Sequence, residues 1–148
     1  MYFLYLGGIL GYIRYYKYNS IMKNCVNYGG VTHSGKSSGL YIGGVAGYSG
    51  GSSFLSGVYN CLNYGSITHG GAIADNLHLG GIVGSSYYIT IGGCVSGGKI
   101  SFSKSINSNS VGSIVGISGP EHSSTTLTSQ VIWNKFNLNI YIFLYDLF

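Results

Sequence analysis

One short segment of the chain has the letters of a nucleotide-binding loop. Residues 30–37, "GVTHSGKS", match the pattern G-x-x-x-x-G-K-[ST] at every required position. A phosphate loop needs a helix directly after it, because the helix N-terminus and the backbone amides hold the phosphates. The residues that follow, "SGLYIGGVAGYSGG", are glycine-rich and favour a strand instead. We therefore predict that Lys36 and Ser37 belong to an ordinary turn and that the chain hydrolyses no nucleotide.

Other chemically active side chains are sparse. The only acids are Asp75, Glu121 and Asp146, too few and too scattered for a calcium site or for paired general acid and base. His33 and His69 occupy matching positions in "THSG" and "THGG", so they could share a metal ion or could each cap a turn. We favour caps, because two histidines without an acid or a third nitrogen make a poor metal site. The sequence thus predicts no enzyme, no catalytic or metal-binding residue and no cofactor.

Two motifs recur in phase along the chain and reveal its organisation. The string GG-[IV]-x-G begins at Gly7, Gly43 and Gly80, with a degenerate copy at Gly112, in steps of 36, 37 and 32 residues. The second motif, "NCVNYGGVTH", recurs 36 residues later as "NCLNYGSITH" and again, more weakly, as "GCVSGGKIS". Two motifs in register over most of the chain indicate about four repeat units of roughly 36 residues, the last one eroded.

Each repeat unit has the composition of short strands and turns. Two β-rich runs per unit, such as "LYIGGVAGY" and "CLNYGSIT", alternate with Gly/Ser/Asn stretches, and the 26 glycines argue against any helix. In the second run, strand alternation sets Cys61 and Asn63 on one face and Leu62 and Tyr64 on the other. Stacked units then place like residues over like residues. The sequence predicts an all-β fold, a parallel β-solenoid (β-helix) of Gly-rich units with two short strand runs in each.

The repeats fix the expected boundaries and the expected stacks of identical residues. We expect an N-terminal segment at 1–6, the solenoid at 7–136 and an apolar tail at 137–148. The predicted structural ladders contain Cys25, Cys61, Cys94, Asn27, Asn63, Gly43, Gly44, Gly80 and Gly81.

The three cysteines carry no C-x-x-C pair and are expected to be small inward hydrophobes. If one unit makes one coil, neighbouring cysteine Cα atoms lie about 4.8 Å apart, within disulfide range. If one unit makes two coils, that distance doubles to about 9.6 Å and bridging is impossible. The two motifs alternate about every 18 residues, which favours two coils and free thiols. A Cys25–Cys61 bridge remains the alternative.

The repeat motifs resemble the GLUG-type repeats of bacterial surface and adhesin-like proteins, which also occur next to the peptidase domain of IgA-specific metalloendopeptidases. The resemblance rests on "GGIVG" and "NCLNYG" and covers about residues 7–136, where even "VIWNKF" is similar to the segment that closes such arrays. It implies a β-solenoid stalk or adhesive module at a cell surface. It implies no enzyme, because in those proteases the catalytic domain lies outside the repeats.

The predicted function is non-catalytic, adhesion-type binding to a host protein or a glycan, outside the cell or at its surface. The 15 tyrosines motivate it, because tyrosine with serine and asparagine also dominates antibody contact loops. Tyr28, Tyr64 and Tyr48 are the candidate binding residues. The alternative is a structural stalk or spacer, part of a larger repeat protein, that has no ligand and can self-associate through exposed solenoid ends.

Charge and hydropathy argue against nucleic acid as a partner and against an integral membrane segment. The net charge of +4 comes from seven scattered basic residues, too few phosphate contacts for nucleic-acid binding. The apolar C-terminal run is about half the ~20 residues of a membrane-spanning helix, and the N-terminal run lacks the charged region of a convincing signal peptide.

Overall fold

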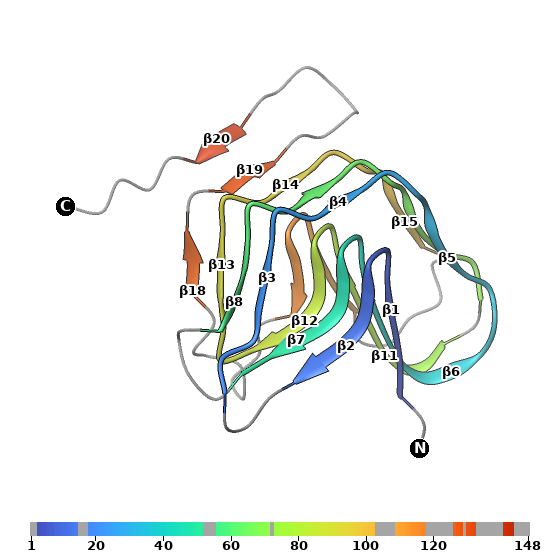
Figure 1. Cartoon of the computed structure of the whole chain (residues 1–148). Helices are drawn as coiled ribbons and strands as arrows, with labels where there is room; N and C mark the ends of the chain where they lie inside the picture. Colours follow the sequence, from blue (N-terminus) through green and yellow to red (C-terminus); the bar gives the residue numbers. More distant parts are fainter. Residues whose placement is uncertain are drawn as a thin grey trace.

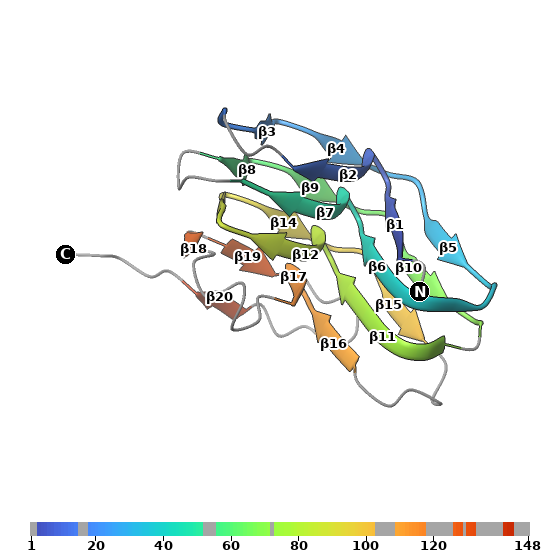
Figure 2. The ribbon, with the colours of Figure 1, turned by 90° about the horizontal axis from the view of Figure 1, so that it is seen from below.

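The chain folds as a parallel β-solenoid (Figure 1). The computed structural model describes residues 3–14, 18–51, 56–71, 73–102, 109–117, 126–128, 130–132 and 141–143, and within these ranges the regular elements are all strands. The predicted fold class is confirmed. Seen from the side, successive coils lie beside one another as layers (Figure 2).

Each of the first three repeat units makes one coil of five strands. Coil one holds β1 (Phe3–Gly7), β2 (Leu10–Arg14), β3 (Ile21–Lys23), β4 (Val26–Asn27) and β5 (Val31–His33). Coil two holds β6 (Ser37–Gly43), β7 (Ala46–Gly50), β8 (Gly57–Tyr59), β9 (Leu62–Asn63) and β10 (Ile67–His69). Coil three holds β11 (Ile73–Gly80), β12 (Val83–Tyr87), β13 (Thr90–Gly92), β14 (Val95–Ser96) and β15 (Ile100–Phe102).

The remaining strands continue the same sheets. They are β16 (Asn109–Gly112), β17 (Val115–Ile117), β18 (Thr126–Thr128), β19 (Gln130–Ile132) and β20 (Tyr141–Phe143). The sheet orders are β1-β6-β11-β16, β17-β12-β7-β2, β18-β13-β8-β3, β20-β19-β14-β9-β4 and β15-β10-β5. Every pairing is parallel except β19 with β20, which is antiparallel and lies in part within the predicted tail.

The expectation of two coils per unit is wrong. Val26 pairs with Leu62, and Phe3 pairs with Gly39, so paired residues are one whole unit of 36 residues apart. The 18-residue alternation of the motifs arises because the GG turn and the cysteine corner face each other across one coil. Each predicted run is also divided into two strands by a turn. Residues 3–6, expected to precede the solenoid, are part of β1 and belong to coil one.

The coil is re-entrant, because β6 runs into its interior and the chain turns back as β7 (Figure 1). The turn divides the buried apolar side chains into two clusters. One lies between the sheets of β7 and β8 and contains Val45, Val58 and Ile91. The other lies between the sheets of β6 and β10 and contains Leu40, Ile42, Ile67, Leu77 and Leu79. A coil this short thereby gains two dry cores instead of one wide cavity.

The tip of the inner turn contacts the opposite wall of its coil. A Cβ atom on Gly44 would occupy the space of the Asn63 side chain and of the Gly81 carbonyl oxygen. Gly8 meets Asn27 in the same way in coil one. The GG motif recurs because this approach leaves no room for a side chain. In coil three the corresponding pair is Gly81 with the smaller Ser96.

The asparagines opposite the turn form the first predicted ladder. The Nδ2 atom of Asn27 donates to Oδ1 of Asn63 at 2.9 Å, and Asn63 is fully buried. Each asparagine also closes a local turn, since Asn63 donates to the carbonyl of Gly65 at 3.0 Å and accepts from its amide at 3.1 Å. These bonds satisfy the polar groups of a side chain that would otherwise be costly to bury.

Left-handed backbone explains the residue before each cysteine. Asn24, Asn60 and Gly93 have φ angles of 57°, 52° and 62° and occupy the same corner of successive coils. Asparagine and glycine are the residue types that adopt this region most readily. The "NC" and "GC" pairs are thus a turn residue followed by an inward thiol.

Between coils two and three the unit length changes at two places. A bulge in β11 adds one residue, because Ile73 pairs with Ser37 but Asn76 pairs with Gly39. The corner between β12 and β13, shorter than the corresponding corner between β7 and β8, then shortens the third unit: Ala46 pairs with Val83, 37 residues on, whereas Gly57 pairs with Thr90, 33 residues on. The strand registers are therefore kept while one corner changes length.

Gly44→Ala is expected to lower the free energy of unfolding by about 1–3 kcal/mol, because the new Cβ overlaps the Asn63 side chain and the Gly81 carbonyl oxygen. Urea denaturation followed by circular dichroism measures the change. Gly70→Ala in the same coil is the matched control, since a Cβ there meets nothing within 4 Å. Equal stability of the two variants would show that the inner turn has more room than this packing allows.

Candidate binding face and stacked side-chain columns

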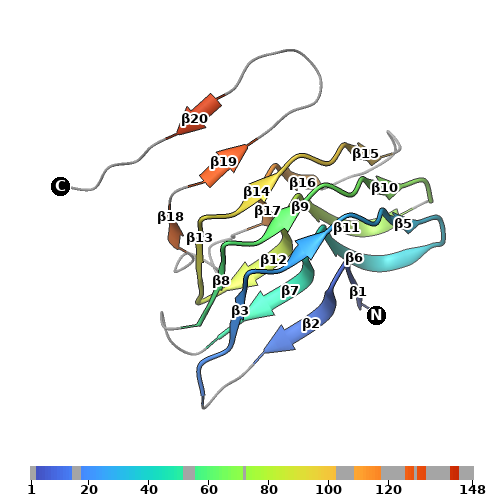
Figure 3. The ribbon, with the colours of Figure 1, turned by 45° about the horizontal axis from the view of Figure 1, so that its top comes forward.

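The most exposed aromatic surface of the first two coils lies on the outer side of β4, β5, β9 and β10 and of the turns that follow β4 and β9. Tyr28 and Tyr64 follow β4 and β9 directly, and Thr32 and Thr68 occupy the centres of β5 and β10. Figure 3 turns these strands toward the viewer. We call these four residues the tyrosine–threonine face. Cys61, Asn63, Gly65 and Ile67 are buried between the outward positions, as strand alternation predicts.

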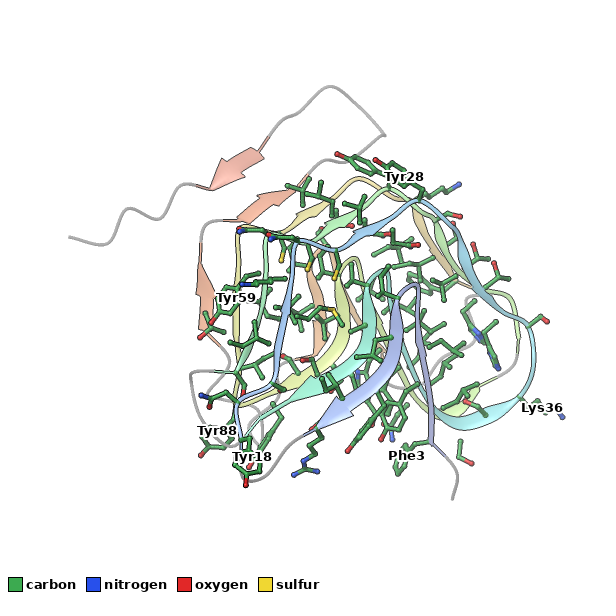
Figure 4. The ribbon with its side chains drawn as sticks, in the orientation of Figure 1. Phe3, Tyr18, Tyr28, Lys36, Tyr59 and Tyr88 are labelled. Atoms are coloured by element: carbon green, nitrogen blue, oxygen red, sulfur yellow. The ribbon has the colours of Figure 1, made fainter. Side chains whose placement is uncertain are left out.

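The two tyrosines are stacked on consecutive coils. Their ring centroids lie 5.4 Å apart with an interplanar angle of 16°. Tyr28 is 76% exposed and Tyr64 is 44% exposed, and Figure 4 shows Tyr28 pointing outward from the corner after β4. The Asn27–Asn63 pair lies directly before the tyrosines, so the backbone beneath the rings is held by buried hydrogen bonds. The pair is a rigid aromatic platform and not a mobile loop.

The tyrosine stack ends at a glycine. The Tyr64 amide donates to the Asn27 carbonyl at 2.8 Å, and the Gly97 amide donates to the Asn63 carbonyl at 2.8 Å. Gly97 therefore occupies the third-coil position below Tyr28 and Tyr64 and places no side chain there. One face of the Tyr64 ring stacks with Tyr28, and the other faces this bare position.

Tyr48 is not on this surface, in contrast to the sequence prediction. It is 8% exposed, and its ring stacks on Tyr12 at a centroid distance of 4.8 Å. Tyr48 lies on β7, one of the two strands that run through the interior of the coil. A residue on β7 that points away from the first core faces the other interior strand and not solvent. An aromatic position on β7 is thus enclosed by rings from β1 and β2.

The aromatic cluster around Tyr48 was missed by motif reasoning. Tyr5, Tyr41 and His78 form one column on β1, β6 and β11, with centroid distances of 5.0 and 4.8 Å. Burial raises the pKa of Tyr5 and Tyr41. A signal was present, because Tyr41 follows Tyr5, and Tyr48 follows Tyr12, by one unit of 36 residues.

His33 and His69 lie side by side at the ends of β5 and β10. Their Nδ1 atoms are 3.1 Å apart, and the ring centroids are 5.2 Å apart with an interplanar angle of 17°. The expected capping role is wrong for His69, which is 1% exposed, points inward with Ile67 and has a buried Nε2 atom without a hydrogen-bond partner. In the third coil Phe102 takes the place of the histidine.

Within the described ranges, no three His, Cys, Asp or Glu side chains come close enough together to hold a metal ion. A hydrogen bond between the rings explains the short contact, since one neutral imidazole can donate from Nδ1 to the unprotonated Nδ1 of the other. Protonating the accepting Nδ1 would set two N–H donors against each other and place a positive charge in this half-buried pair.

Lys36 of the phosphate-loop pattern and the three cysteines lie outside the tyrosine–threonine face. Lys36 lies between β5 and β6 and points away from the solenoid in Figure 4, and the element after it is a strand instead of the helix that a phosphate loop needs. Cys25, Cys61 and Cys94 follow one another on adjacent coils with free thiols. Among the described segments, none is a helix of the length and apolarity that crossing a membrane requires.

Acidification is expected to destabilise the fold through the histidine pair. Burial, and next the nearby His69, lower the pKa of His33 below its ordinary 6.5. The unfolded chain therefore binds a proton more readily, so stability falls as the pH drops from 6.5 toward the lower folded-state value. His33→Phe is expected to make the denaturation midpoint less sensitive to pH between 7.5 and 5, since an aromatic ring already fits this column at Phe102. The same pH dependence in both proteins would contradict this.

Comparison with known proteins adds no relative. No family model, no curated protein and no solved structure matches the chain. Function is therefore inferred from the geometry of the tyrosine–threonine face and from the repeat motifs.

Proposed function

We propose that the chain is a non-catalytic repeat module of the adhesion type, which binds a glycan on its tyrosine–threonine face outside the cell or at its surface. The observation that carries the proposal is the stacked pair of Tyr28 and Tyr64 on a rigid, hydrogen-bonded corner. Large rings are ordinarily withdrawn from water, so two adjacent exposed rings suit a surface that a ligand covers. The resemblance of the repeats to GLUG-type arrays supports the same function.

The arrangement of side chains favours a glycan over other ligands. A sugar ring has an apolar face of C–H groups and a rim of hydroxyls. Gly97, in register below Tyr64, has no side chain to cover that side of the ring, where we expect such a sugar to stack. Thr32 and Thr68, in register on the next strands, supply hydroxyls that can both donate and accept. A protein ligand, which tyrosine-rich surfaces also bind, is the second outcome of the test.

A structural spacer is the second candidate function. The specific observation in its favour is the outer edge of coil one, where β1 to β5 pair with coil two on one side only. Exposed large hydrophobic residues concentrate in this coil: Phe3, Leu4, Ile9, Tyr12, Tyr18, Ile21, Val26 and Tyr28. An apolar edge with unpaired strands suits stacking against another solenoid coil. Such a module would self-associate and need no ligand.

Tyr28→Ser and Tyr64→Ser together are expected to reduce glycan binding at least tenfold on a panel of immobilised oligosaccharides. The loss follows because stacking on an aromatic ring needs its flat face, which serine lacks. Surface plasmon resonance on the strongest hit gives the affinity.

The control is Tyr88→Ser, because Tyr88 is 37% exposed on another part of the solenoid and packs against Tyr87. Circular dichroism verifies that all variants keep the fold. Glycan binding that survives the double substitution would remove the proposed face. No binding by the intact protein, together with concentration-dependent association in light scattering, would favour the spacer.

A further inference from the structure

The cysteines form a column at one corner of the solenoid. The Leu62 amide donates to the Cys25 carbonyl at 2.8 Å, and the Val95 amide donates to the Cys61 carbonyl at 2.9 Å. The three cysteines therefore occupy consecutive rungs of one ladder, and adjacent Cα atoms in such a ladder are about 4.8 Å apart, inside the range that a disulfide spans. Figure 4 shows the sulfur atoms gathered on the inner side of this corner.

The thiol hydrogen bonds show where the sulfur atoms lie along the column. Each donates to the carbonyl two residues before it, as Cys61 does to Tyr59 at 3.2 Å. Cys94 also reaches the carbonyl of Val58 at 3.5 Å, which belongs to coil two. Its sulfur therefore lies on the side of its own coil that faces Cys61.

Access from solvent differs sharply along the column. Cys25 is partly exposed, whereas Cys61 and Cys94 are fully buried. A small oxidant can therefore reach Cys25 but not the two thiols beneath it. Cys61 alone is adjacent to both other thiols, so the column can hold one internal disulfide at a time, and Cys61 is always part of it.

The proton affinities also differ along the column. Contact with Cys61 lowers the pKa of Cys94, whereas contact with Cys94, and next burial, raise the pKa of Cys61. Burial raises the pKa of Cys25. Since the thiolate is the attacking species in exchange, the raised pKa values make Cys25 a slow entry point and Cys61 a slow second attacker at neutral pH.

We propose that this column is a disulfide relay, which accepts oxidation at Cys25 from a low-molecular-weight disulfide and passes it inward to a Cys61–Cys94 bond. In the first step the Cys25 thiolate attacks the small disulfide, forms a mixed disulfide and releases one small thiol. In the second step Cys61 attacks the Cys25 sulfur, forms Cys25–Cys61 and releases the second small thiol. In the third step Cys94 attacks the Cys61 sulfur, forms Cys61–Cys94 and returns Cys25 to the thiol.

The third step depends on the stacking of the coils. A thiolate attacks a disulfide along the axis of the sulfur–sulfur bond, on the side opposite the leaving sulfur. Cys94 and Cys25 lie on opposite sides of Cys61 because the three coils are consecutive. The product joins coil two to coil three inside the dry core, out of reach of small reductants. Two electrons pass to the small disulfide in total, and two small thiols are the only other products.

The relay is tested by following the disulfides in time. The reduced protein is incubated with oxidised glutathione, quenched with acid and alkylating reagent, and digested after tyrosine, which separates Cys61 from Cys94 at Tyr64 and Tyr87. Mass spectrometry is expected to find the glutathione adduct of Cys25 and the Cys25–Cys61 bond first. Later samples are expected to contain Cys61–Cys94 with an unmodified Cys25. A stable adduct at Cys25 without any internal bond would overturn the proposal.

Variants separate the steps. Cys25→Ser is expected to slow Cys61–Cys94 formation at least tenfold, and Cys94→Ser is expected to stop at Cys25–Cys61. Cys61→Ser is expected to give only the Cys25 adduct. If Cys25→Ser forms the buried bond at the wild-type rate, the oxidant enters elsewhere and the relay is wrong. Circular dichroism checks each fold, and because Cys25 is partly exposed, its variant keeps the core that the buried substitutions alter.

Discussion

The contact between the inner glycine turn and the opposite wall of the coil is the constraint on which the rest of the structure depends. It sets the Gly44 backbone against the Asn63 side chain and divides each coil into two narrow cores. A ring of about 36 residues without this inward fold would enclose a space too wide for its own side chains to fill at normal density. The two motifs recur together because they are the two sides of one contact.

Stacking has a chemical consequence that differs with the residue type. Asparagine suits a column, since its amide donates to the next asparagine and accepts from its own turn. Tyrosine also suits it, since rings at the spacing of the coils can stack. Histidine and cysteine columns place titratable groups next to their own kind, as the contacts His33–His69 and Cys61–Cys94 show. Repetition thus brings ionisable side chains of one kind into contact along the described coils.

Much of the fold could be predicted from the sequence, because the alternation of Cys61, Leu62, Asn63 and Tyr64 between core and solvent is a local property of a strand. The number of coils per unit could not, since an 18-residue spacing fits both a full turn and the distance across one coil. The burial of Tyr48 depends on the inward fold, which no local pattern encodes. The inward direction of His69, in contrast, follows from the same local alternation, because Ile67 two residues before it belongs to the second core.

At the corner between β7 and β8, the number of residues can change without a change in the pairing of the flanking strands. Six residues connect these strands in coil two, whereas two residues connect β12 and β13 in coil three, and the sheets on both sides keep their pairing. The length of the connection at this corner can therefore vary while the coils stay in register. A foreign peptide grafted there would be displayed at the rim of a rigid scaffold, and the duplication of whole coils would repeat it at the rung spacing of the solenoid.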